Sequence, residues 1–131
     1  MKSFNFVLLA VLLPMVIFFT GCRNENIRNI ENEPVIVTSK GISLEKTTKA
    51  IQQAGISRGW SMRLVKPGHI EATLNLRKHM AKVDINYTTK SYSITYKDSA
   101  ELGYDGTQIH KNYNSWVNNL DISIKQKLGL L

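Results

Sequence analysis

Two segments in the middle of the chain decide its fold: Ile70-Glu-Ala-Thr-Leu-Asn-Leu76 and Ala81-Lys-Val-Asp-Ile-Asn-Tyr87. In each, apolar and polar residues alternate with a period of two, as in a β-strand with one buried and one exposed face. The same period runs through residues 60–64 before them and 92–96 after them, and short polar turns separate the four segments. The pattern predicts a four-stranded antiparallel meander with one apolar and one polar face.

Amphipathic helices are predicted on both sides of this meander. Ser43 is suited to cap a helix near residues 43–57, and Asp105 or Thr107 to cap a second helix after residue 107. Val35-Ile-Val37 predicts a short fifth strand ahead of the first helix. Because an apolar sheet face needs a cover, the predicted fold class is α+β, a two-layer sandwich in the order β-α-β-β-β-β-α with both helices on that face.

The chain opens with a different kind of segment. Lys2 is followed by an apolar run, Phe6–Phe19, and the run ends at Phe19-Thr20-Gly21-Cys22, which contains the only cysteine. A basic start, an apolar segment and a small-residue exit are typical of an export signal that is removed. About 14 apolar residues interrupted by Pro14 are short for a spanning helix, which needs ~20.

This ending resembles the lipobox of bacterial lipoproteins. Gly21 and Cys22 match the lipobox, and Phe19 stands where it usually has Leu. The resemblance implies that residues 1–21 are cleaved and that Cys22 carries acyl chains such as palmitate. Arg23 rather than Asp follows the cysteine, which by analogy with enterobacterial sorting implies the outer membrane, facing the periplasm. The remainder resembles small Gram-negative envelope lipoproteins that have no assigned activity.

The domain organisation follows from composition. Residues 22–34 are polar and rich in Asn, which predicts a flexible tether, and the lipobox resemblance implies that this segment begins at a lipidated Cys22. Residues 35–131 are then a single globular domain. One cysteine cannot form an intramolecular disulfide, so this domain must fold from its core alone.

The chain is basic, with 17 Lys and Arg, 10 Asp and Glu and a net charge of +7. A positive excess can favour anionic lipids, acidic glycans or an acidic envelope protein. The basic residues are spread along the chain, however, and the simpler interpretation is a solvated surface. Nucleic acid is not an expected partner of an exported domain.

Catalytic and metal sites are not expected. His69 and His79 lie near opposite ends of one predicted strand, so with His110 they do not suggest a metal site, and no cofactor is implied. Glu71 and Asp84 share the polar sheet face and could form a glycosidase-like carboxylate pair. Basic residues on the same face make cross-strand ion pairing the simpler explanation. The chain is therefore interpreted as a non-enzymatic binding or accessory module.

Two sets of candidate binding residues remain. Arg63, Arg77 and Lys82 are expected on the polar sheet face. Tyr104, Asp105 and His110 lie in the segment 104–113, where aromatic and polar side chains could suit a sugar, although a turn, a helix cap and core packing explain them as well. The leading hypothesis is a lipid-anchored protein that binds an envelope protein or anionic polymer. The alternatives are a carbohydrate-binding or hydrolytic protein that uses this segment, and a structural subunit of an envelope complex.

Overall fold

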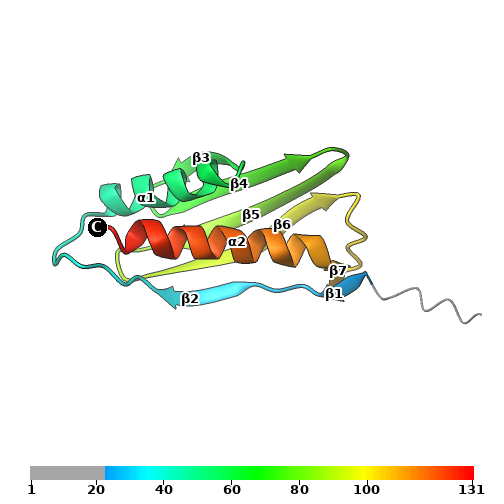
Figure 1. Cartoon of the computed structure of the whole chain (residues 1–131), viewed down its shortest axis with the longest axis horizontal. Helices are drawn as coiled ribbons and strands as arrows, with labels where there is room; N and C mark the ends of the chain where they lie inside the picture. The colour runs from blue at the N-terminus through cyan, green and yellow to red at the C-terminus, as the bar shows by residue number, and fades with distance from the viewer. Residues whose placement is uncertain (1–22) are drawn as a thin grey trace, which may run out of the picture.

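The structure, a computed structural model, describes residues 23–131, so the predicted leader and Cys22 lie outside the described residues. The chain forms a five-stranded antiparallel sheet in the order β2-β6-β5-β4-β3, a separate two-stranded sheet of β1 and β7, and two helices (Figure 1). In chain order the elements are β1 (Asn24–Asn26), β2 (Ile30–Pro34), α1 (Leu44–Ser57), β3 (Ser61–Lys66), β4 (His69–Leu76), β5 (His79–Tyr87), β6 (Ser91–Ala100), β7 (Gln108–His110) and α2 (Lys111–Leu128).

The predicted α+β class is confirmed, and the predicted meander is present as β3 to β6. The predicted order was wrong in detail, because β1 and β7 pair in a second, two-stranded sheet that the pattern did not predict. The extra strand of the main sheet also comes earlier than predicted, at Ile30–Pro34 and not at residues 35–37. It pairs antiparallel with β6, the last strand of the meander.

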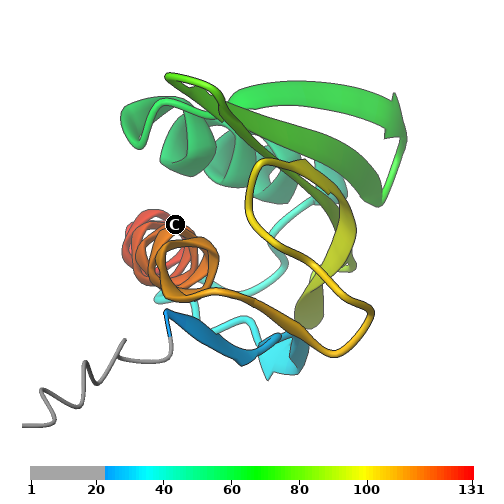
Figure 2. The same cartoon turned by 90° about the vertical axis from the view of Figure 1, so that its right-hand side faces the viewer.

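The apolar face of the sheet forms the core. Alternate residues of the central strands, among them Ile70, Val83, Ile85 and Ile94, are at most 1% exposed. Both helices lie on this face, and the sheet curves around them (Figure 2). Burying an apolar side chain of this size stabilises the fold by about 1.5–3 kcal/mol relative to leaving it exposed. Covering the apolar face is therefore what holds the two layers together.

Two buried hydroxyl groups connect the sheet to the helices. The Tyr87 hydroxyl lies 2.6 Å from Oγ1 of Thr48 on α1, and the Tyr92 hydroxyl donates to the Asp121 carboxylate on α2. Burial and this carboxylate raise the pKa of Tyr92, so its hydroxyl stays a donor. These bonds fix where each helix lies along the sheet.

The start of α1 was predicted correctly and the start of α2 was not. The Ser43 side chain accepts from the Lys46 amide at 3.2 Å, as expected of an N-cap. The N-cap of α2 is His110, whose Nδ1 accepts from the Asn112 amide at 3.1 Å. Residues 108–110 form β7, so α2 begins at Lys111, later than a cap at Asp105 or Thr107 would place its start.

The interpretation of residues 22–34 as a flexible tether was also wrong for the described part of that segment. Ile30 is 7% exposed and pairs with Ile94, and Ile27 packs against the core. One Asn residue supplies a hydrogen bond, because Oδ1 of Asn29 accepts from the Tyr96 amide at 2.9 Å. Another, Asn32, adopts a positive φ of 51°. Asn tolerates this backbone conformation better than most residues do. The polar composition thus serves pairing with the sheet.

Candidate functional site

The polar face of the sheet carries a network of ion pairs centred on Glu71. Its carboxylate lies 3.1 Å from Nη2 of Arg63 and 2.9 Å from Nζ of Lys97, and Lys82 approaches it at 3.8 Å. The register places Glu71 directly between Arg63 on β3 and Asp84 on β5. The cross-strand ion pairing expected from the sequence is therefore confirmed. Arg63 and Lys82, two of the candidate binding residues, are already paired within the molecule.

The same network argues against acid–base chemistry at this face. The side-chain hydrogen bond from Lys97, followed by that from Arg63, lowers the pKa of Glu71 from 4.5 to about 2. A general acid at neutral pH needs a raised pKa. Asp84 is held by Lys97 at 3.5 Å and by Nε2 of His69 at 2.7 Å. Glu71 is therefore better placed to stabilise the sheet than to donate a proton, and its contacts tie Asp84 into the same network.

Arg77, the third basic candidate, lies elsewhere. It is exposed in the β4–β5 turn, with a φ of 56°, beyond the strands that carry the network. The sequence pattern did not distinguish it from Arg63 and Lys82, because a turn interrupts the alternation at that point. The structure therefore does not bring the three residues together into one site.

The candidate residues of segment 104–113 have local structural roles. The Asp105 carboxylate accepts from the amides of Gln108 at 2.7 Å and Thr107 at 2.9 Å, and these bonds lower its pKa. His110 caps α2. The Tyr104 ring lies against Tyr96, with ring centroids 4.1 Å apart, and remains 39% exposed. The turn and cap interpretation explains these side chains, and they line none of the concave sites described next.

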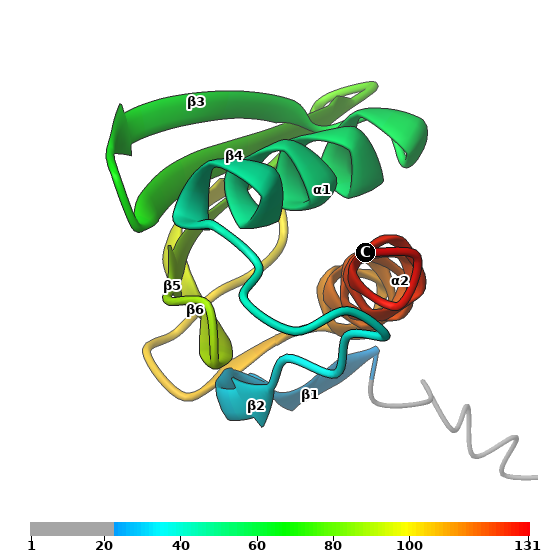
Figure 3. The same ribbon diagram turned by 90° about the vertical axis from the view of Figure 1, so that its left-hand side faces the viewer.

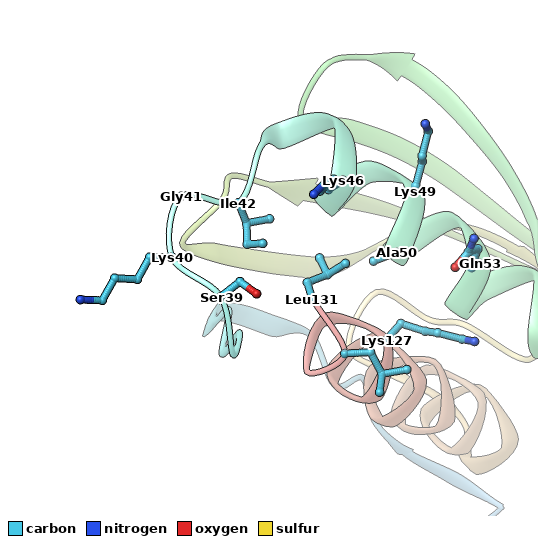
Figure 4. Close-up of a pocket in the computed structure, with 11 residues that line it drawn as sticks. Ser39, Lys40, Gly41, Ile42, Lys46, Lys49, Ala50, Gln53, Lys127 and Leu131 are labelled. Carbon is cyan, nitrogen blue, oxygen red and sulfur yellow. The ribbon is translucent and has the colours of Figure 1, made fainter.

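A concave site at the other end of the molecule was not anticipated from the sequence. It has a volume of about 570 Å³ and lies between α1, the end of α2 and the loop after β2 (Figures 3 and 4). The Leu131 carbonyl oxygen holds this loop, accepting from the Ser39 amide at 3.1 Å and from Oγ1 of Thr38 at 3.0 Å. We call this site the lysine pocket. Its described lining is Ser39, Lys40, Gly41, Ile42, Lys46, Lys49, Ala50, Gln53, Lys127, Leu130 and Leu131.

The lysine pocket has an apolar floor and a basic rim. Its described lining includes four Lys and neither Asp nor Glu. Figure 4 shows Lys40 directed outward into solvent, whereas Lys46 and Lys127 come from different helices on either side of Ile42 and Leu131. Lys46 lies in the first turn of α1, where the helix dipole is also positive. An anion with an apolar portion matches this arrangement.

A smaller groove lies between α1 and the edge strand β3. Its volume is about 390 Å³, and its lining is largely apolar, including Leu44, Leu64 and Pro67. Leu64 is 45% exposed, although the alternation predicted an inward-facing residue there. Strand β3 is at the end of the sheet, beyond full cover by α1, which explains its exposure.

We expect the Glu71 network to make stability depend on acid pH. The pKa of Glu71 is about 2 in the folded chain and 4.5 when unperturbed, so the unfolded chain binds more protons between these values. The contribution should be complete above pH 4.5 and disappear as pH falls through 4.5 toward 2. Glu71→Gln should destabilise residues 23–131 at pH 7, measured by urea unfolding, and the difference from wild type should shrink at pH 3.

The matched control is Glu45→Gln, because Glu45 makes an exposed i,i+4 pair with Lys49 on α1. Exposed pairs contribute little, so this variant should change stability much less at either pH. An equal loss of stability for Glu71→Gln at pH 7 and pH 3 would contradict the assignment.

Comparisons of the chain with protein-family models, curated proteins and solved structures find no match. Within residues 23–131, neither helix is long and apolar enough to cross a membrane. In the same residues, no three His, Cys, Asp or Glu side chains are grouped so that they could hold a metal ion. The arguments about function therefore rest on the chain's own residues.

Proposed function

We propose that this protein is a lipid-anchored, periplasm-facing envelope lipoprotein that binds an anionic envelope polymer without catalysing a reaction. The lysine pocket is the observation that carries the binding proposal. Its volume of about 570 Å³ lies within the usual range of ligand sites. The rim supplies positive charge through Lys46 and Lys127, with neither Asp nor Glu in the described lining, and the floor supplies apolar contact.

The contacts of four carboxylates support a binding role over a catalytic one. Glu71, Asp84 and Asp105 are held by cations or backbone amides, and Asp121 accepts from Tyr92 and Lys125. The carbohydrate-binding alternative has less support, since Asp105 and His110 are used in a turn and a cap.

The lipid anchor is supported by the Phe19–Cys22 motif and by the position of the chain just after it. Arg23 is already part of the folded domain, because its carbonyl oxygen accepts from the Lys111 amide at 2.7 Å. This end is opposite the lysine pocket along the long axis of the molecule (Figure 1). An anchor at Cys22 would therefore leave the pocket open to the periplasm. The proposed sorting to the outer membrane rests only on the analogy with enterobacterial sorting, because Arg23 and not Asp follows the cysteine.

The anchor is tested by feeding an alkyne analogue of palmitate to a Gram-negative host that expresses the full chain. The wild-type protein should become labelled, and Cys22→Ser should remove the label because Cys22 is the only cysteine. Inhibiting the lipoprotein signal peptidase should cause a precursor that retains residues 1–21 to accumulate. An unmodified thiol on Cys22 of the mature protein, found by intact-mass analysis, would refute the anchor.

Binding is tested with the detergent-extracted full chain and two probes that share a backbone, dextran sulfate and neutral dextran. Only dextran sulfate should bind, and more weakly at high salt because exposed charges are screened. Lys46→Glu/Lys127→Glu should weaken binding by roughly tenfold or more, since each exposed charge contributes up to about 1 kcal/mol.

Arg28→Glu/Lys111→Glu is the matched control. It makes the same change in net charge with exposed residues near the opposite end of the molecule. It should retain most of the binding. Equal losses in the two double variants would show that net charge, and not the lysine pocket, attracts the polymer.

A further inference from the structure

The N-terminal arm, residues 24–34, leaves almost no free chain between Cys22 and the folded domain. The Arg23 carbonyl oxygen is bonded to the Lys111 amide, and the next residues pair with β7 in register, Asn24 with His110 and Asn26 with Gln108. The Ile27 amide extends this pairing by donating to the Thr107 carbonyl oxygen at 2.9 Å. Because one residue spans at most about 3.6 Å, the backbone of Cys22 must lie within about one residue length of Arg23.

The same end of the molecule carries a second group of residues suited to a membrane surface. The β4–β5 turn projects at this end, as Figures 1 and 2 show. The end of β4 and the turn present the exposed residues Leu76, Arg77 and Lys78, and Leu76 is 47% exposed. An exposed Leu can enter the boundary between headgroups and acyl chains, while neighbouring cations contact lipid phosphates.

Carboxylates also lie at this end, although none belongs to the run Leu76–Lys78 in and beside the turn. Asp105 is exposed and accepts from the Thr107 and Gln108 amides, and Glu25 accepts from Asn114 at 3.2 Å. Glu101 is exposed in the β6–β7 loop, which lies between the turn and β1 (Figure 1). Arg23 adds a cation beside the anchor point itself.

We propose that the mature protein stands end-on on an anionic phospholipid bilayer, with β1 and the β4–β5 turn both at the headgroups. This inference rests on the proposed anchor at Cys22 and goes beyond it, because an anchor on a flexible tether would fix no orientation. The two contact points lie on different sides of the end face (Figure 2), so together they limit tilting. The lysine pocket then always points away from the membrane.

Labelling is straightforward because lipidation consumes the only cysteine, so an introduced thiol is the only one free to react. The lipidated full chain is reconstituted in vesicles of phosphatidylethanolamine and phosphatidylglycerol that contain a headgroup spin label. A fluorophore is attached either at Asn75→Cys, beside the turn, or at Lys90→Cys, in the β5–β6 turn at the other end. The spin label should quench the fluorophore at position 75 several-fold more strongly than that at position 90.

Charge reversal separates the contribution of the turn. Each basic side chain favours an anionic surface by roughly fivefold, so Arg77→Glu/Lys78→Glu should reduce quenching at position 75 several-fold. Lys66→Glu/Lys90→Glu, with the same charge change away from this end, should leave it unchanged. Flotation with the vesicles reports the anchor independently.

Each outcome decides between the proposals. Flotation with equal quenching at positions 75 and 90 overturns the end-on orientation and leaves the anchor intact. Flotation with the expected contrast, but no effect of Arg77→Glu/Lys78→Glu, overturns the contact through the turn. Loss of flotation overturns the anchor, and the end-on orientation with it.

Discussion

The apolar face of the five-stranded sheet is the constraint on which the rest of the structure depends. Alternation along β4, β5 and β6 puts every second side chain on that face, and water must be excluded from it. Helices α1 and α2, one from each half of the chain, cover this face and exclude water from it. The buried bonds from Tyr87 to Thr48 and from Tyr92 to Asp121 then fix each helix in place. The opposite face can stay polar because its charges neutralise one another around Glu71.

The N-terminal arm depends on the same sheet. The main sheet would end at β6 without β2, and pairing with β2 covers that edge. Glu31, Glu33 and Pro34 then occupy the new edge strand, and charged residues and proline are typical of edges that resist pairing with other chains. Segment 24–34 thus closes one side of the domain and also carries the chain to the point nearest Cys22. The same few residues therefore complete the fold and lead directly to the proposed anchor.

Local patterns allowed part of this architecture to be predicted. The meander and α1 follow from short-range periodicity and from the Ser43 cap, which need no knowledge of distant residues. The arm was missed because its Asn residues act through long-range partners, such as the Tyr96 amide for Asn29, and composition alone suggests disorder. The ion pairs of Arg63 and Lys82 followed from strand register, but the lysine pocket did not, because Lys46 and Lys127 are brought together only by the packing of α1 against α2.

The claim at the centre of this account is that residues 24–34 belong to the folded domain. Amide hydrogen exchange of residues 23–131 tests it most directly, because exchange requires the hydrogen bond to open. The Ile27 amide, bonded to Thr107, should be protected well above the unfolded chain, as the Tyr87 amide is expected to be through its bond to Gly68. Exchange of the Ile27 amide at the rate of an unstructured peptide, with Tyr87 still protected, would show a flexible tether and contradict the account.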